Sequence, residues 1–391
     1  MTRKLSFALC LTVVMSMAGC QDQKTEPTAP AAGAGPELAQ RATSPKADRN
    51  TIKLPAGLRI RDQQLGSVTR RVIDPDDFVC PPSTPLIDFL IGTIDESIAT
   101  EPDIFSTLIN LAADAVPTFD AIFFETEATP QFFGYNGEYT HRMTKVERDL
   151  KRFWDIASAD IQLVGMHGTM LLDVDRVARV YENFGPNLFG QPIPHDLALE
   201  LAGIVRDALL ASVTMDGGNY PLFSFNAFAV AGDQSIPDKI VMGDGVMASY
   251  KEIGFDDVAP EAIYAHEFGH HVQFQKGYFD DPLATTGDLA ERTRYTELMA
   301  DALGAFYLTH KRGAAMNQKR VAQFLEVYFN VGDCAFDNPG HHGTPNQRMR
   351  AANFAFNLAD QAQKQGHIPT ADEFHAAFVA AYPDLIAPDA T

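Results

Sequence analysis

Two histidines and a glutamate form a His-Glu-x-x-His motif at His266, Glu267 and His270. Pro260 suits the first turn of a helix and no other proline follows before Pro282, so one helix can contain the whole motif. Because four residues make about one helical turn, His266 and His270 project from the same face and can bind one metal ion. Glu267 is offset by about 100° around the helix, which places it beside the ion, where a general base for hydrolysis belongs.

A second pair of acids, Glu297 and Asp301, follows in a predicted helix over residues 291–309. Four residues apart, the two carboxylates share one face of that helix. Their neighbours leave little polar surface around them: Met299, Ala300, Ala302 and Leu303. Buried acids need partners, so the pair is expected to interact with other polar groups. An exposed helix that happens to contain two acids is the alternative.

These two segments resemble the corresponding segments of the gluzincin metallopeptidases. Their local sequences, His-Glu-Phe-Gly-His-His-Val-Gln and Glu-Leu-Met-Ala-Asp, are most similar to those of the bacterial neutral zinc metallopeptidase group. The resemblance covers roughly residues 220 to 350. It implies an α+β, mostly helical, zincin-like fold with a small sheet over the motif helix. It also implies one zinc ion and the following roles: zinc ligands His266, His270 and Glu297, general base Glu267, and Asp301 orienting one ligand histidine.

The chemistry of this ligand set agrees with the resemblance. Two imidazoles and one carboxylate leave zinc an open position, as in catalytic sites, whereas structural zinc sites close the shell, usually with cysteines. Glu267 would take a proton from the attacking water in the hydrolysis of a peptide bond. The metzincin alternative is excluded, because its longer motif needs Gly and His where this chain has Gln273 and Lys276.

The same bacterial group has a later His-Gly-Thr segment, which matches residues 342–348 here. Charge that develops in the transition state needs a donor besides the metal. His342 is our candidate for that donor, with His341 as the fallback. The alternative is that both are loop residues without a catalytic part.

The elements that must position these residues can be outlined from hydrophobic spacing. Helices are predicted over residues 104–116, 147–156, 197–212 and 371–381. Pro117 is expected to end the first of these helices, and Asp196 is expected to cap the third. Strands are predicted over 161–166, 222–230 and 239–242. Helix, strands and metal helix then follow in the order expected for the N-terminal lobe of a zinc peptidase.

One predicted strand is also a candidate substrate site. A substrate peptide could add a strand to the sheet by pairing with the backbone of Asn226, Ala227 and Phe228. A similar sequence occurs at this place in other gluzincins. A strand buried inside the sheet is the alternative. His167, at the end of another predicted strand, is interpreted as a local hydrogen-bonding group.

The N-terminus indicates export and lipid attachment. Residues 1–19 begin with a short basic stretch and continue with an apolar run too short to span a bilayer, as in a signal peptide. The run ends at Cys20 and resembles the lipobox of bacterial lipoproteins; an ordinary signal with an incidental cysteine is the alternative. Residues 20–54 lack apolar clusters and are predicted to be a flexible tether. The expected location is therefore the cell envelope, on the periplasmic face of a bacterial membrane.

Charge and cysteine usage narrow the partners. Loss of residues 1–19 removes two basic residues, so 29 Lys plus Arg face 51 Asp plus Glu and the net charge changes from −20 to −22. A nucleic-acid partner is not expected for such a chain. In an oxidising compartment Cys80 and Cys334 are expected to form a disulfide, with two separate thiols as the alternative.

The predicted organisation after the tether has two parts. Residues 55–190 show no chemical motif, and residues 191–391 contain the predicted catalytic region with a helical C-terminal part. The expected partners are a peptide or protein substrate and a membrane contacted through the lipid. A binding or assembly lipoprotein that keeps the metal fold without turnover is a second hypothesis, although it has no need of Glu267. A hydrolase of another amide, such as one in cell-wall peptide, is a third.

Overall fold

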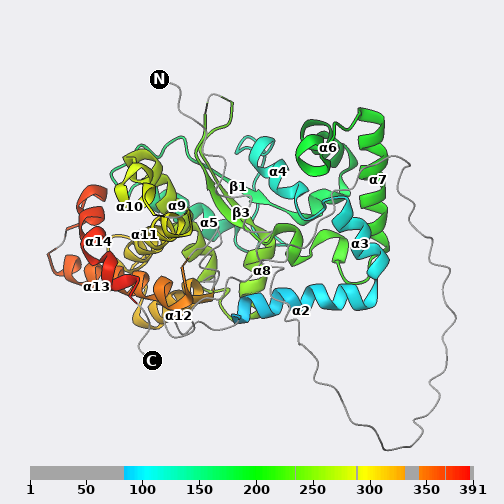
Figure 1. Cartoon of the computed structure of the whole chain (residues 1–391). Helices are drawn as coiled ribbons and strands as arrows, with labels where there is room; N and C mark the ends of the chain where they lie inside the picture. The colour runs from blue at the N-terminus through cyan, green and yellow to red at the C-terminus, as the bar shows by residue number, and fades with distance from the viewer. Residues whose placement is uncertain (1–82, 234, 288, 331–342, 366, 388–391) are drawn as a thin grey trace, which may run out of the picture.

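A three-stranded sheet lies between two groups of helices (Figure 1). The computed structural model describes residues 83–233, 235–287, 289–330, 343–365 and 367–387. The strands in these ranges are β1 Gln162–Met166, β2 Ala227–Val230 and β3 Lys239–Gly243. β3 lies in the middle, parallel to β1 and antiparallel to β2, so β2 forms one edge of the sheet.

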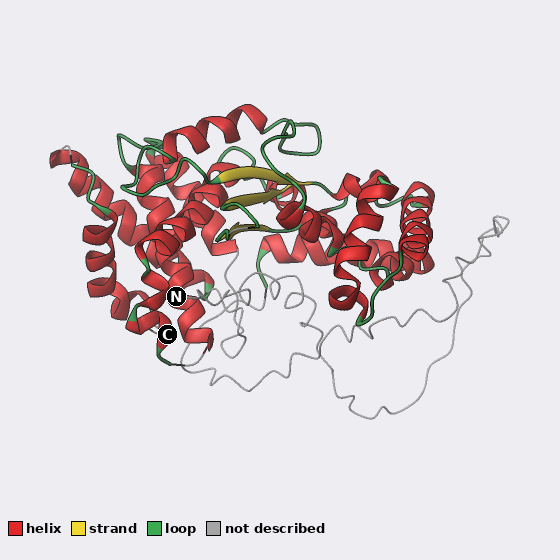
Figure 2. Ribbon diagram, turned by 90° about the horizontal axis from the view of Figure 1, so that it is seen from above, coloured by secondary structure: helices red, strands yellow, loops and turns green. Residues whose placement is uncertain are grey.

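Helices make up most of the described structure and border the sheet on both sides (Figure 2). They are α2 Pro85–Thr100, α3 Pro102–Asn110, α4 Val116–Phe123, α5 Thr140–Leu150, α6 Val174–Phe189, α7 His195–Ala211, α8 Asp244–Glu252, α9 Ala259–Lys276, α10 Pro282–Thr285, α11 Leu289–Thr309, α12 Gln318–Asn330, α13 Pro345–Gln365 and α14 Ala371–Leu385. Short 3-10 helices cover Gly168–Leu172, Asp216–Gly218, Pro221–Ser224 and Tyr278–Asp280. The predicted fold class, mostly helical α+β with a small sheet beside the motif helix, is confirmed.

Each group of helices has its own apolar core. Phe268 and Phe306 belong to a core shared by α9, α11, α12 and α14, on the side of the sheet where the motif lies. Tyr181 and Leu201 belong to a second core between α6, α7 and α3. Each large side chain of this kind contributes about 1.5–3 kcal/mol when fully buried, and Leu163 of β1 and Ile240 and Met242 of β3 join the first of these cores to the sheet.

The motif helix α9 begins and ends as its sequence predicts. Pro260 lies in its first turn, where a missing N–H costs no hydrogen bond. At the other end Gly277 adopts the left-handed conformation, with φ 74°, and donates its N–H to the Gln273 carbonyl. This helix cap favours glycine because any other residue would be strained there. The whole His-Glu-x-x-His motif therefore lies in the regular middle of one helix.

Helix α11 runs through the interior beside α9. Every residue from Tyr295 to Thr309 is buried, because α9 packs on one side and α13 on another. The contact with α9 is close: a Cβ atom added to Gly269 would lie 3.1 Å from the Cα and the carbonyl oxygen of Ala300. Small residues at the crossing thus bring the two backbones together, and with them the candidate ligands.

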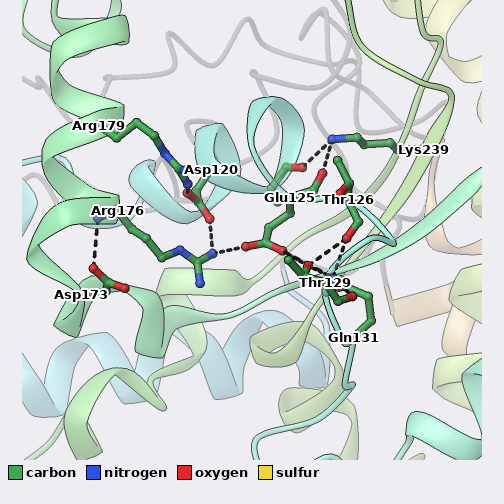
Figure 3. Close-up of polar contacts among 11 residues, drawn as sticks. Asp120, Glu125, Thr126, Thr129, Gln131, Asp173, Arg176, Arg179 and Lys239 are labelled. Carbon is green, nitrogen blue, oxygen red and sulfur yellow. Dashed lines mark hydrogen bonds and ion pairs between the residues drawn. The ribbon is translucent and has the colours of Figure 1, made fainter.

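Lys239, the first residue of β3, ties the sheet to both groups of helices. Its amino group donates to carbonyls at the end of α4, with 2.7 Å to the Ile122 oxygen, and also to the Glu125 carbonyl (Figure 3). Its own carbonyl accepts a hydrogen bond of 2.8 Å from Nε2 of His271 in α9. Beside it Arg176 bridges the carboxylates of Asp120 and Glu125 (Figure 3). The network fixes β3, and hence the sheet, against the motif helix.

Several predicted element boundaries are wrong, and prolines explain two of them. Pro117 does not close a helix over 104–116 but lies in the first turn of α4, after α3 has ended at Asn110. Pro194, rather than Asp196, is at the N-cap position of α7. The helix predicted over 147–156 is α5, which ends at Leu150.

The strand predicted over 222–230 is confirmed only for its second part, Ala227–Val230, which forms β2. Its first part is the 3-10 helix Pro221–Ser224, which packs against the start of α8. Gly245 makes this approach possible, because an added Cβ atom would lie 2.1 Å from the Pro221 carbonyl oxygen. The apolar alternation of these residues therefore reflects packing under α8 rather than a longer strand.

The predicted signal peptide, the tether, lipidation at Cys20 and the disulfide between Cys80 and Cys334 all lie outside the described residues. So do the candidate donors His341 and His342. Among the helices that the structure describes, each is too short or too polar to cross a lipid bilayer.

Candidate metal centre

Three buried side chains from α9 and α11 converge on one point. Nε2 of His266 lies 3.3 Å from one carboxylate oxygen of Glu297, and Nε2 of His270 lies 3.4 Å from the other. The three ligand atoms are all within 4.8 Å of one another. The His266, His270 and Glu297 group can therefore hold one metal ion, and in the described part of the chain no other such group of three is present.

The far nitrogen of each imidazole has a fixed partner. Nδ1 of His266 lies 2.7 Å from Oδ1 of Asp301. Nδ1 of His270 lies 2.8 Å from Oε1 of Gln273, whose Nε2 donates to the Thr296 carbonyl at 2.7 Å. Because a carbonyl can only accept, that second bond identifies the Gln273 atom facing His270 as an oxygen. Both Nδ1 atoms are thus donors.

This pattern decides what the three side chains can hold. A neutral imidazole that donates from Nδ1 has a lone pair on Nε2. Two such lone pairs and a carboxylate then face one another in a site shielded from water, which is unfavourable unless a metal ion, or a proton on one imidazole, supplies positive charge between them. A nitrogen, nitrogen, oxygen set with hydrogen-bonded far nitrogens is the usual construction of a metal site. The residues present fit a metal ion.

Electrostatics differ at the two histidines in the protein without an ion. Burial lowers the pKa of His266, but its hydrogen bonds to Asp301 and Glu297 outweigh burial and raise that pKa to about 10. Burial lowers the pKa of His270 to about 4, because the opposing effects of the Glu297 charge and of the hydrogen bond to the neutral Gln273 amide are too small to offset it. Without an ion, His266 is therefore the histidine of the pair that is protonated at neutral pH.

Glu267 lies beside the candidate ligands and also contacts the sheet. Burial, reinforced by the negative charge of Glu297, raises the pKa of Glu267 to about 8, although His266 opposes the rise. Its carboxylate accepts a hydrogen bond from the backbone N–H of Ala229 in β2. The predicted base is thus held between the metal group and the edge strand.

The open edge of β2 is next to this carboxylate. Gly243 N–H donates to the Asn226 carbonyl at 2.9 Å, so Phe228 and Val241 form the next hydrogen-bonded pair of the antiparallel ladder. The backbone groups of Ala227 and Ala229 consequently point away from β3. Of the three predicted substrate-binding residues, Ala227 presents its backbone at the open edge, whereas the Phe228 ring lies in the core.

His167 lies at the opposite edge of the sheet. Its Nδ1 is 2.6 Å from Oδ2 of Asp244, its ring stacks on Phe132, and the other oxygen of Asp244 accepts the Gly134 N–H. The interpretation as a local hydrogen-bonding residue agrees with these contacts, which join β1 to the start of α8.

Two residues of the site were not assigned a role from the sequence. Gln273 follows His270 by three positions on α9, a spacing at which helical side chains meet, so its contact could have been anticipated. Arg348 comes from α13 and forms two hydrogen bonds with Asp301. Its segment was recognised by resemblance, but no spacing rule connects position 348 with position 301.

Comparison with known proteins finds no family model that matches this chain, and no curated protein or solved structure that is significantly similar to it.

Proposed function

We propose that this protein is a zinc-dependent peptide-bond hydrolase of the gluzincin type. The main support is the convergence of His266, His270 and Glu297 with Glu267 beside them in one buried site. Two imidazoles and one carboxylate suit a catalytic zinc ion, because they leave a coordination position open. A purely structural site has no need of a further carboxylate at the position of Glu267.

The roles of the side chains follow from their contacts. Zinc would supply Lewis acidity, which polarises a carbonyl group and makes water a nucleophile at neutral pH. Glu267 would accept the proton of the attacking water on its carboxylate and pass it to the leaving amine. Asp301 and Gln273 would keep the two ligand imidazoles in the orientation that their Nδ1 hydrogen bonds define.

The substrate would lie along the open edge of β2. The outward N–H and carbonyl of Ala227 can pair with an extended peptide, as in other cases where a peptide adds a strand to a sheet. The N–H of Ala229 holds the Glu267 carboxylate at the same edge. A peptide bound there would run past the base, which favours an extended peptide over a compact substrate.

The test is paired. Zinc content and cleavage of a fluorescently labelled unstructured protein are measured for the purified chain and for Glu267→Gln. We expect close to one zinc per chain in both and cleavage only in the wild type. Glu261→Gln is the matched control, because Glu261 lies on α9 but pairs with Arg320 outside the site. Full zinc without cleavage in the wild type would favour the binding or narrow-substrate hypothesis, and absence of zinc would refute the metal site.

We further propose that a lipid on Cys20 attaches the chain to the bacterial cell envelope. The apolar run that ends in a small-residue stretch before Cys20 supports this proposal. Cys20→Ala is expected to move the protein from the membrane fraction to the soluble fraction. Unchanged membrane association of the variant would contradict it.

A further inference from the structure

Arg348 lies directly behind the candidate metal ligands. Its Nε donates to Oδ2 of Asp301 at 2.7 Å, and a terminal nitrogen donates to Oδ1 at 2.6 Å. Both side chains are withdrawn from water, with 3% of the Arg348 side chain and none of Asp301 exposed. A two-point contact of this kind fixes the plane of the carboxylate as well as its position.

The start of α13 is built to place this arginine. Thr344 and Gln347 form a capping box, in which the Gln347 N–H donates to the Thr344 hydroxyl at 3.1 Å and the Thr344 N–H donates to the Gln347 side chain at 3.0 Å. Pro345 occupies the first helical position, and Gly343 precedes the cap with φ 96°. Gln347 also donates to the Ile386 carbonyl just after α14. Arg348 therefore projects from a helix start that is held at several points.

The chemistry of the contact determines the state of His266. A guanidinium has donors only, so both oxygens of Asp301 that face it are acceptors. Oδ1 also lies 2.7 Å from Nδ1 of His266, which must then be the donor. The distance of 3.4 Å between Arg348 and the same Nδ1 joins two donors and is not a hydrogen bond. In the neutral form of His266, which is the form that binds a metal, the lone pair is consequently on Nε2, facing Glu297.

We propose that Arg348 is a positioning residue of the metal centre. Acting through Asp301, it fixes the orientation and the protonated nitrogen of His266, and thereby the affinity of the site for its ion. The inference rests on metal binding as proposed above.

Charge supports the same role. Asp301 is buried next to His266, and Arg348 compensates its negative charge within the protein. The positive charge of an ion is then available to Glu297 and Glu267. At His270 the corresponding partner is the neutral Gln273, which needs no compensation. Of the two ligand imidazoles in the described structure, that of His266 has the charged partner, Asp301, and Asp301 has its own counter-charge in Arg348.

The experiment compares zinc affinities, measured by competition with a chromogenic chelator. We expect Arg348→Met to weaken zinc binding by about 10- to 100-fold, the usual effect of losing a partner behind a ligand. Arg348→Lys should restore part of that loss, since lysine keeps the charge but not the two-point contact. Arg350→Met is the matched control, because Arg350 also projects from α13 but donates to carbonyls at and beyond the end of α14.

A double-variant cycle separates positioning from packing. If Arg348 acts through Asp301, then Asp301→Asn with Arg348→Met should bind zinc about as weakly as Asp301→Asn alone. Independent effects that multiply, or wild-type affinity in Arg348→Met, would overturn the inference while leaving the metal site intact. Should Arg348→Met fail to fold, Arg348→Lys and the double variant, which removes both buried charges, provide the same comparison. A wild-type chain that binds no zinc would instead refute the proposed function.

Discussion

Gly304 of α11 lies against the backbone of His266 with no room for a side chain. A Cβ atom added to Gly304 would be 3.0 Å from the His266 nitrogen and from the Ala265 carbonyl carbon, and 2.7 Å from the Tyr328 hydroxyl. Asp301 lies one turn earlier on the same helix and accepts a hydrogen bond from Nδ1 of the same histidine. The distance between the ligand helices is therefore set by the absence of one methyl group.

Gly304→Ala is expected to separate α9 from α11. We expect a loss of about 1–3 kcal/mol in the free energy of unfolding, as for other overpacked interiors, together with weaker zinc binding. Chemical denaturation and zinc titration measure the two effects. Gly203→Ala in α7 is the control, because an added methyl there meets nothing within 4 Å and should be neutral or stabilising by up to about 1 kcal/mol. Equal behaviour of both variants would show that the crossing tolerates a methyl group.

Gln273→Met is expected to reduce zinc affinity by about 10- to 100-fold. The change keeps the length of the side chain but removes the acceptor for Nδ1 of His270 and the donor to the Thr296 carbonyl. Isothermal titration or chelator competition gives the affinity. Gln275→Met, two residues further on α9, removes hydrogen bonds with the Ala157 backbone and should leave zinc binding unchanged. An unchanged affinity in Gln273→Met would mean that His270 needs no partner.

Ala227→Pro should impair peptide cleavage without loss of metal. Proline removes the N–H that points away from β3, a position that edge strands tolerate, so the ladder with β3 remains. Loss of one hydrogen bond to the substrate is expected to lower kcat/KM by about 10-fold. Ala227→Ser retains the N–H and serves as the control. Normal cleavage by the proline variant would place the substrate elsewhere.

Glu101 should make stability depend on pH. Its carboxylate accepts from the hydroxyls of Ser212 and Thr214 and from the backbone N–H groups of Val213 and Thr214. Burial raises the pKa of Glu101, but these bonds outweigh it and hold the pKa below the ordinary value of 4.5. The stabilisation is therefore complete above that value and is lost as the pH falls through the lower pKa of the folded protein.

Glu101→Gln measures this contribution. At pH 7 we expect it to reduce the free energy of unfolding by about 1–3 kcal/mol, because donors lose a charged acceptor. The difference from wild type should shrink as the pH falls below 4.5 and through the lower pKa of Glu101 in the folded protein, where the wild-type carboxyl takes up a proton. Glu96→Gln, an exposed change on α2, is the control. A difference that stays constant with pH would refute the charge effect.

The sequence predicted the centre of the molecule better than its surroundings. α9 and α11 were identified because ligand spacing, prolines and apolar runs all indicate the same helices. The buried strands β1 and β3 were likewise found from their apolar residues. In these elements local propensity and tertiary packing agree, so a local pattern is sufficient.

The errors arose where packing overrides local pattern. Residues 221–224 look like the start of a strand but pack under α8 as a 3-10 helix, which only the glycine at 245 permits. Pro117 was interpreted as a helix end, although proline is equally suited to a first turn. The contact between Arg348 and Asp301 spans 47 residues, and a single sequence contains no spacing rule for such a distance.

The positions of Asp301 and Arg348 in the chain also determine when the site can form during synthesis. Asp301 is 35 residues beyond His266 in the chain, and Arg348 is 82 residues beyond it. At about 5–20 residues per second, the ribosome adds Arg348 about 4–16 s after the histidine. A growing chain that already contains every candidate ligand still lacks the residue that orients one of them. We therefore expect the ion to be bound tightly only by the completed polypeptide, so that metal loading reports the end of folding rather than its start.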